Sequence, residues 1–142
     1  MSFPEIVSFA AAEPGPYERQ MGRVIAALLR LTASYSPDAE SNRHVLELAT
    51  TPGSWSAAHR SFQELRARLL EASRAQDRPR ELQYQFEEAC CQAMYNATDP
   101  TDAFDPSAPF FVVPLVLALA NAAGVSCSAV YAAIESANAS AA

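Results

Sequence analysis

The most apolar segment of the chain, residues 108–120, constrains the fold more than any other feature. It contains thirteen consecutive residues without a charged or hydrogen-bonding side chain, whereas a helix that crosses a membrane needs roughly twenty apolar residues. Asn121 and Gly124 end the segment, and Pro114 inside it is expected to kink or divide the helix, because proline removes a backbone hydrogen bond. A helix that is apolar on every side must be surrounded. We therefore expect the central helix of a bundle or half of a subunit interface, and no membrane anchor.

Apolar residues in the rest of the chain recur at helical spacing. The clearest pattern has steps of three and four residues and comprises Trp55, Ala58, Phe62, Leu65, Leu69 and Ala72. This spacing is typical of a helix that packs nearly parallel to its neighbours. Similar stripes predict helices over residues 17–35 and 80–97, the latter with two apolar faces and hence two neighbours, and shorter helices over 2–12, around 45–49 and over 126–138.

No run of strand length alternates apolar and polar residues, and no short hairpin turn is present in the sequence. A chain of 142 residues is long enough to bury a core of its own. The expected fold class is all-α, a compact single-domain bundle of about five to seven helices over residues 1–142. We expect one very apolar central or interface helix and a short flexible C-terminal tail.

Charge is unevenly distributed along the chain. All ten basic residues are arginines, and the net charge is −6. Residues 1–56 carry a net charge of −2, residues 57–80 carry +3, and residues 81–142 carry −7. Nucleic-acid binding needs a basic face, so the acidic balance argues against it. The arginine-rich segment is expected to form a solvated helix face or a contact, with the acidic C-terminal third as its counter-surface.

The cysteines and the N-terminal segment indicate the compartment. Cys90, Cys91 and Cys127 are an odd number and too few for a disulfide framework, which favours a reducing environment. The first residues include Glu5 and no basic residue, so they are not expected to form a secretory signal. We expect a cytoplasmic protein.

The chain carries none of the short motifs that mark common active sites: no nucleophile elbow, no phosphate-binding glycine loop and no paired zinc-binding histidines. His44 and His59 lie on different predicted helices, and no pair of histidines and cysteines has ligand spacing. Cys90 is interpreted as a small core residue. We therefore expect no catalytic residue, no metal and no cofactor. These absences favour a protein that is not an enzyme, and an enzyme whose site is assembled from distant residues stays open as the alternative.

The longest irregular segment, residues 99–109, offers one place for a ligand. Its aspartates lie among prolines, and their spacing differs from that of a calcium-binding loop. Such residues commonly form turns and cap helices. In the alternative interpretation, Asp99, Asp102 and Asp105 form an acidic lip beside an apolar pocket built from Phe104, Phe110 and Phe111, which would admit a cationic or amphipathic ligand.

The leading functional hypothesis is a non-enzymatic helical module that binds protein, either itself as a homodimer or another protein. The candidate contact residues are apolar positions of residues 110–120 and two arginines of the basic segment: Val113, Leu115, Val116, Leu117, Leu119, Arg66 and Arg68. The alternative is a small-ligand binding protein, or an enzyme, with a pocket beside residues 99–109. Neither nucleic acid nor a membrane is an expected partner.

Overall fold

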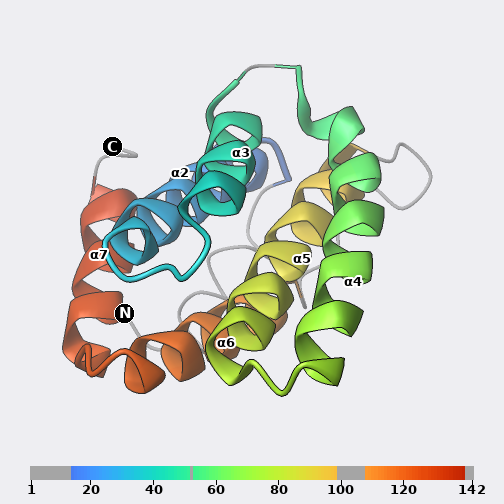
Figure 1. Cartoon of the computed structure of the whole chain (residues 1–142). Coiled ribbons are helices and arrows are strands. Elements are labelled where there is room, and N and C mark those ends of the chain that lie inside the picture. The colour runs from blue at the N-terminus through green and yellow to red at the C-terminus, as the bar shows by residue number, and fades with distance from the viewer. Residues whose placement is uncertain (1–13, 52, 99–107, 140–142) are drawn as a thin grey trace.

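The computed structural model describes residues 14–51, 53–98 and 108–139, and within these ranges the chain is an all-α bundle of six helices without strands (Figure 1). The helices are α2 (Pro14–Ala33), α3 (Ala39–Thr50), α4 (Ala58–Arg74), α5 (Arg78–Thr98), α6 (Ala108–Ala122) and α7 (Cys127–Ala139). A short 3-10 helix, η1 (Trp55–Ala57), precedes α4. The predicted fold class is confirmed. The predicted helix over residues 2–12 and the tail from residue 140 lie outside the described residues.

Local sequence signals set two of the helix ends. Asp38 caps α3, because its side chain accepts a hydrogen bond from the Ser41 N–H (3.1 Å), one of the donors that the first turn of a helix leaves without a partner. Gly124 adopts φ 77° after α6, and the Val125 N–H donates to the Ala120 carbonyl (2.8 Å). This bond is typical of a helix that ends in a left-handed residue. The predicted stop at Gly124 is confirmed.

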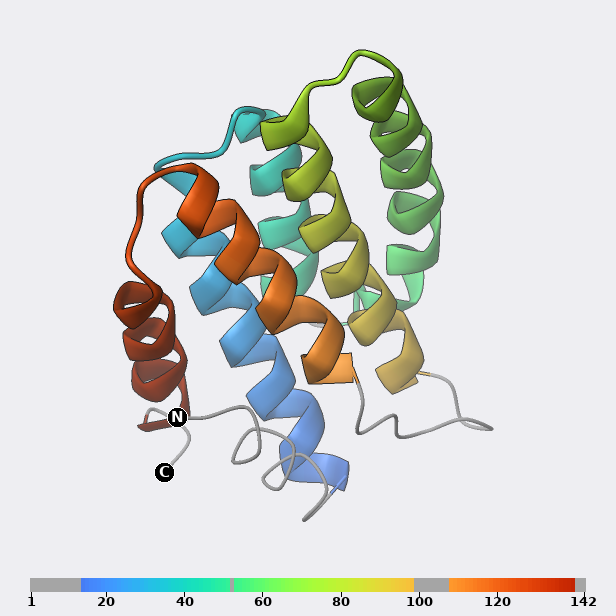
Figure 2. The same cartoon turned by 90° about the horizontal axis from the view of Figure 1, so that it is seen from below.

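Helix α5 lies at the centre of the packing. It contacts α4 and α6, and it also meets α2, α3 and η1 (Figures 1 and 2). Its buried side chains include Phe86 and Met94, which join the core with Ile25 and Leu28 of α2 and Ile134 of α7. Helix α2 packs in turn against α3 and α7. The two apolar faces predicted for residues 80–97 therefore correspond to real neighbours.

Helix α6 packs on α5, with α7 and α2 also in contact (Figure 2). Val113, Val116 and Leu119 are buried, whereas Pro114 is exposed and Leu117 is partly exposed. The bundle thus encloses one side of α6 and leaves another apolar side outward. No helix in the described ranges combines the length and the apolar character needed to cross a membrane.

Pro114 does not divide α6, which continues as one helix on both sides of it. Of the two predicted alternatives, a kinked or a divided helix, the division is therefore wrong, and the kink stays a prediction. Pro114 lies on the exposed side of the helix, where a carbonyl that loses its hydrogen-bond donor can tilt toward water. The cost of the missing bond is smaller there than it would be in the core.

Candidate functional site

A polar groove lies between α3 and α4. Helix α4 packs mainly on α5, whereas α3 packs mainly on α2 and also touches α5 (Figure 1). The groove has a volume of about 220 Å³. Its lining comprises Glu40, Ser41, Arg43, His44 and Glu47 from α3, and Ser61, Glu64, Leu65 and Arg68 from α4. These positions share one face of each helix because they recur at steps of three and four residues.

Two buried serines form the floor of the groove. Ser41 is 2% exposed and Ser61 is 5% exposed. The Ser61 hydroxyl lies 2.9 Å from His44 Nε2, a contact that joins α4 to α3. The Ser41 hydroxyl donates to Glu87 Oε2 on α5 (2.5 Å). Hydrogen bonds therefore join α3 to α4 across the groove, and α3 to α5 beneath it.

Glu87 is a carboxylic acid inside the core. Its side chain is fully buried, and Gln83 Nε2 donates to Glu87 Oε1 (2.8 Å) while Ser41 donates to the other oxygen. Burial raises the pKa of Glu87 to about 7, because the charged form loses its hydration; the two hydrogen bonds oppose this rise without cancelling it. Asp38 also raises this pKa, and Arg68 lowers it. Glu87 thus changes its charge near neutral pH.

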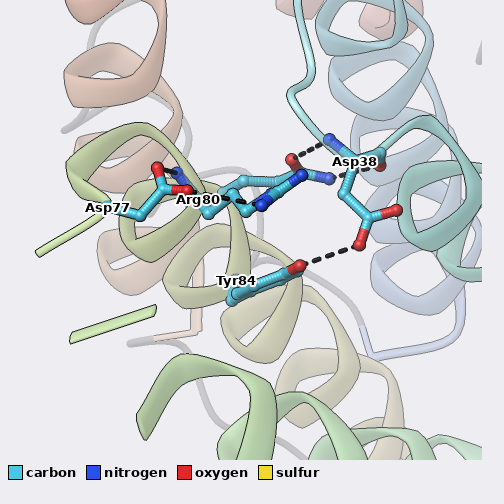
Figure 3. A network of polar contacts seen from close by, with 5 residues as sticks. Asp38, Asp77, Arg80 and Tyr84 are labelled. Carbon is cyan, nitrogen blue, oxygen red and sulfur yellow. Dashed lines mark hydrogen bonds and ion pairs between the residues drawn. The ribbon is translucent and has the colours of Figure 1, made fainter. Parts of the chain in front are cut away.

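Asp38 connects the start of α3 to α5. The Tyr84 hydroxyl donates to Asp38 Oδ2 (2.8 Å), as Figure 3 shows. Gln83 accepts from the Asp38 N–H (3.0 Å) and donates to the Asp38 carbonyl (2.7 Å). Burial raises the pKa of Asp38, but the hydrogen bonds that it accepts and two nearby arginines outweigh this effect and leave the pKa below its ordinary value. Burial and the bond to Asp38 raise the pKa of Tyr84 to about 12.

Charged side chains of both signs surround the groove. The rim carries three carboxylates and two guanidinium groups, which belong to Glu40, Glu47, Glu64, Arg43 and Arg68, and all five residues are exposed. Within the described part of the chain, none of them is in an ion pair. Among the described residues, ion pairs join Arg78 to Glu81 and, as Figure 3 shows, Arg80 to Asp77, and both lie outside the groove.

The pocket predicted beside residues 99–109 lies outside the described structure. Asp102, Phe104 and Asp105 belong to residues 99–107, which are not described. Phe110 and Phe111 belong to the first turn of α6, but their side chains are not described either. That pocket stays a prediction, and the groove between α3 and α4 is a separate feature.

The predicted contact residues fall on two helices. Val113, Val116 and Leu119 are buried within the chain, and Leu115 and Leu117 are partly exposed on α6.

Arg66 and Arg68 are exposed on α4, which packs on α5 and not on α6. The Arg66 guanidinium lies over the Phe62 ring, 5.7 Å from its centroid, and Arg68 lines the groove. The two arginines and the apolar residues of α6 therefore do not form one continuous surface.

The groove contains one pair of side chains of the kind found in catalytic sites, Ser61 and His44. The pair of Ser61 and His44 has the distance of a nucleophile and its base, but in the described structure no side chain orients the other ring nitrogen. Burial raises the pKa of Cys91 to about 12 and that of Cys90 well above its ordinary value, so both thiols stay protonated. No group of three metal-binding side chains occurs among the described residues.

Sequence reasoning missed the most unusual residues of this region, Asp38, Gln83 and Glu87. A usable signal exists for two of them. Gln83 and Glu87 are four residues apart and lie next to the apolar positions Leu82 and Phe86. A polar residue that lies on a helix between apolar core residues faces the interior as they do. The positions of Gln83 and Glu87 therefore predict that both are buried.

No protein-family model matches this chain, and comparisons with curated proteins and with solved structures give no match either. Its function is therefore inferred from its own residues.

Proposed function

We propose that this chain is a non-enzymatic helical module that binds protein, and that its partner is a second copy of the same chain. The supporting observation is the outward side of α6, here called the α6 surface, which comprises Pro114, Leu115, Leu117 and Ala118. Pro114 is exposed, and the other three pack against the core with one part of the side chain and are partly exposed with the rest. A contiguous apolar surface of this kind commonly marks a contact site.

The distribution of charge favours a second copy as the partner. Residues 108–139, which include α6 and α7, contain a single charged side chain, that of Glu135. Two copies each carry a net charge of −6 and repel each other. A contact through the least charged part of the surface brings the fewest like charges together. In a two-fold dimer the same patch is buried on both subunits, which suits an apolar surface.

We further propose that the protein works in the cytoplasm. Cys90 and Cys91 are buried free thiols, and Cys127 is an exposed free thiol. Free cysteines are typical of proteins in a reducing compartment.

The proposal is tested by placing a charge on the α6 surface. Leu117 is partly exposed, so in Leu117→Arg the guanidinium group can reach water in the monomer but becomes buried in a dimer, at a cost of several kcal/mol. We expect a dimer for the wild type and a monomer for the variant in sedimentation equilibrium, with unchanged helical content by circular dichroism.

Leu70→Arg is the matched control, because Leu70 is an exposed leucine (56%) on α4, away from the α6 surface. This variant should keep the mass of the wild type. A folded Leu117→Arg protein that is still a dimer contradicts the proposal.

A further inference from the structure

The first turn of α3 with its cap, residues 38–41, is attached to α5 by polar contacts. The Asp38 N–H donates to Gln83 Oε1, and the Asp38 carbonyl accepts from Gln83 Nε2. The Asp38 carboxylate accepts from the Tyr84 hydroxyl (Figure 3), and Ser41 bonds Glu87. Ser41 is 2% exposed, and Gln83 and Glu87 are fully buried. These bonds therefore form away from water.

The apolar contacts of α3 lie further along the helix. Val45 and Ala49 are buried and belong to the core, whereas the buried residues nearer the start of α3, Ser41 and Asn42, are polar. The Asn42 side chain donates to Thr32 Oγ1 on α2 (2.8 Å), so from Asn42 onward α3 has contacts that do not depend on Glu87. The first turn can therefore separate from α5 while the rest of α3 stays packed.

Glu87 is the group in this contact that can lose a proton. When it is protonated, one oxygen accepts from Gln83 and the hydroxyl can donate to Ser41 Oγ, so both hydrogen bonds form without a charge. When it is ionised, a full charge lies in the core, and none of the ion pairs among the described residues includes it. A buried charge without an ion-pair partner is costly. Separation of the first turn from α5 lets water reach the carboxylate and removes this cost.

The elements packed against α5 contribute few other charges at this point. Asp38 of α3 disfavours the charged form of Glu87, and Arg68 of α4 favours it. On α5 itself, Cys90 and Cys91 stay protonated, because burial raises the pKa of both thiols. Helices η1 and α6 contain no titratable residue, and the arginines of α2 whose side chains are described are exposed.

His44 is a second residue of α3 that can titrate, because histidine changes its charge near neutral pH. Its Nε2 lies 2.9 Å from Ser61 Oγ, so it joins α3 to α4 and not to α5. Asp38 and Tyr84 keep one charge state between pH 5 and pH 8, because the pKa of Asp38 is below its ordinary value of 3.8 and that of Tyr84 is about 12. His44 and Glu87 are therefore the two residues to separate by experiment.

We propose that the first turn of α3 is a pH-sensitive switch that lies on α5 while Glu87 is protonated and detaches when Glu87 is ionised, while the rest of the bundle stays folded. Detachment exposes Ser41, Gln83 and Glu87, which are otherwise buried. The chain then presents to water a polar surface that it encloses at lower pH. The switch lies on α3 and α5, and it does not depend on the proposed contact through α6.

The direction of the pH dependence follows from the two states of Glu87. In the detached state its carboxyl group is in water, where the ordinary pKa is 4.5, whereas the pKa is about 7 in the attached state. The attached state holds the proton more tightly, so the contact is strongest below about pH 4.5 and weakens as the pH rises through about 7. From pH 5 to pH 8 the equilibrium constant for detachment should rise roughly seventyfold.

Hydrogen exchange of the Asp38 amide, measured by NMR, tests the proposal, because this N–H donates to Gln83 across the contact. Its protection factor, from which the intrinsic exchange rate at each pH is divided out, should fall roughly seventyfold from pH 5 to pH 8. In Glu87→Gln it should stay constant. Detachment of one turn exposes little surface, so low concentrations of urea should leave this exchange unchanged, whereas they should accelerate exchange of the buried Leu119 amide in α6.

His44→Gln is the matched control, because glutamine can still bond Ser61 but does not titrate. This variant should show the pH dependence of the wild type. The proposal is overturned if the protection of the Asp38 amide is the same at pH 5 and pH 8, or if its pH dependence persists in Glu87→Gln or is lost in His44→Gln. It is also overturned if urea accelerates exchange at Asp38 as much as at Leu119, because the amide then exchanges only when the whole bundle unfolds.

Discussion

The buried carboxyl group of Glu87 makes the stability of the fold depend on pH. Its pKa is about 7 in the folded chain and 4.5 ordinarily, so the folded state holds the proton more tightly than the unfolded state. The stability that this proton contributes is complete below about pH 4.5 and is lost as the pH rises through about 7. Glu87→Gln removes the charge but keeps the shape, so we expect it to raise the free energy of unfolding at pH 8 by about 3 kcal/mol and to leave it unchanged near pH 4.5.

Urea unfolding, followed by circular dichroism between pH 4.5 and 8, measures this effect. Glu71→Gln, an exposed acid on α4, is the control and should follow the wild type over the whole range. Parallel pH profiles for wild type and Glu87→Gln contradict the assignment of Glu87 as the titrating group.

Asp38 is the second residue on which local stability depends. It caps α3 through the Ser41 N–H and accepts the hydroxyl of Tyr84. Loss of a helix cap costs about 1 kcal/mol and loss of a further hydrogen bond about 1 kcal/mol more. We expect Asp38→Ala to lower the free energy of unfolding by about 2 kcal/mol in urea titrations at pH 7. Glu40→Ala changes an exposed residue in the same turn and should cost less than about 0.5 kcal/mol; equal losses in the two variants count against the capping role.

The sequence predicts apolar core residues better than buried polar ones. The hydrophobic period identifies Phe86 and Cys90 as core positions, and both are fully buried. The spacing of apolar residues does not say whether a polar residue between them, such as Glu87, has a hydrogen-bond partner. The partners of Glu87 include Ser41, 46 positions earlier, and such a pairing depends on how distant helices pack.

At the level of single helices, the sequence pattern is most reliable where apolar spacing is regular. The predicted seam of α4 is confirmed, because Ala58, Leu65 and Ala72 are buried and Phe62 and Leu69 pack against the core. Predictions from a single residue that goes against the apolar spacing are less reliable. Pro114 was expected to kink or divide α6. The helix is not divided, because the apolar contacts on both sides of Pro114 outweigh one missing hydrogen bond, and the expected kink stays a prediction.

Pro114 therefore lowers the stability of α6 without breaking it. Pro114→Ala restores a backbone donor and relieves the clash of the ring with the preceding turn, effects worth up to about 3 kcal/mol within a helix. Because Pro114 is exposed, we expect a gain of about 1 to 2 kcal/mol in the free energy of unfolding, measured in urea. Asn121→Ala, at an exposed position of the same helix, should change it by less than about 0.5 kcal/mol. A loss of stability in Pro114→Ala contradicts this account.

At the level of the whole molecule, composition and periodicity predict the all-α bundle, because six amphipathic or apolar segments of this length have few other ways to bury their apolar faces. They do not predict the groove. It lies where α3, which packs mainly on α2, meets α4, which packs mainly on α5, and no local pattern encodes this arrangement. The polar groove and the α6 surface lie on different helices, the groove on α3 and α4 and the apolar surface on α6.

The native mass spectrum of the purified wild-type protein tests the central claim most directly. A chain of 15.3 kDa that pairs through the α6 surface should appear at twice that mass, and the dimer signal should disappear in Leu117→Arg and persist in Leu70→Arg. A wild-type protein that is found only at 15.3 kDa, at every concentration examined, contradicts self-association through α6.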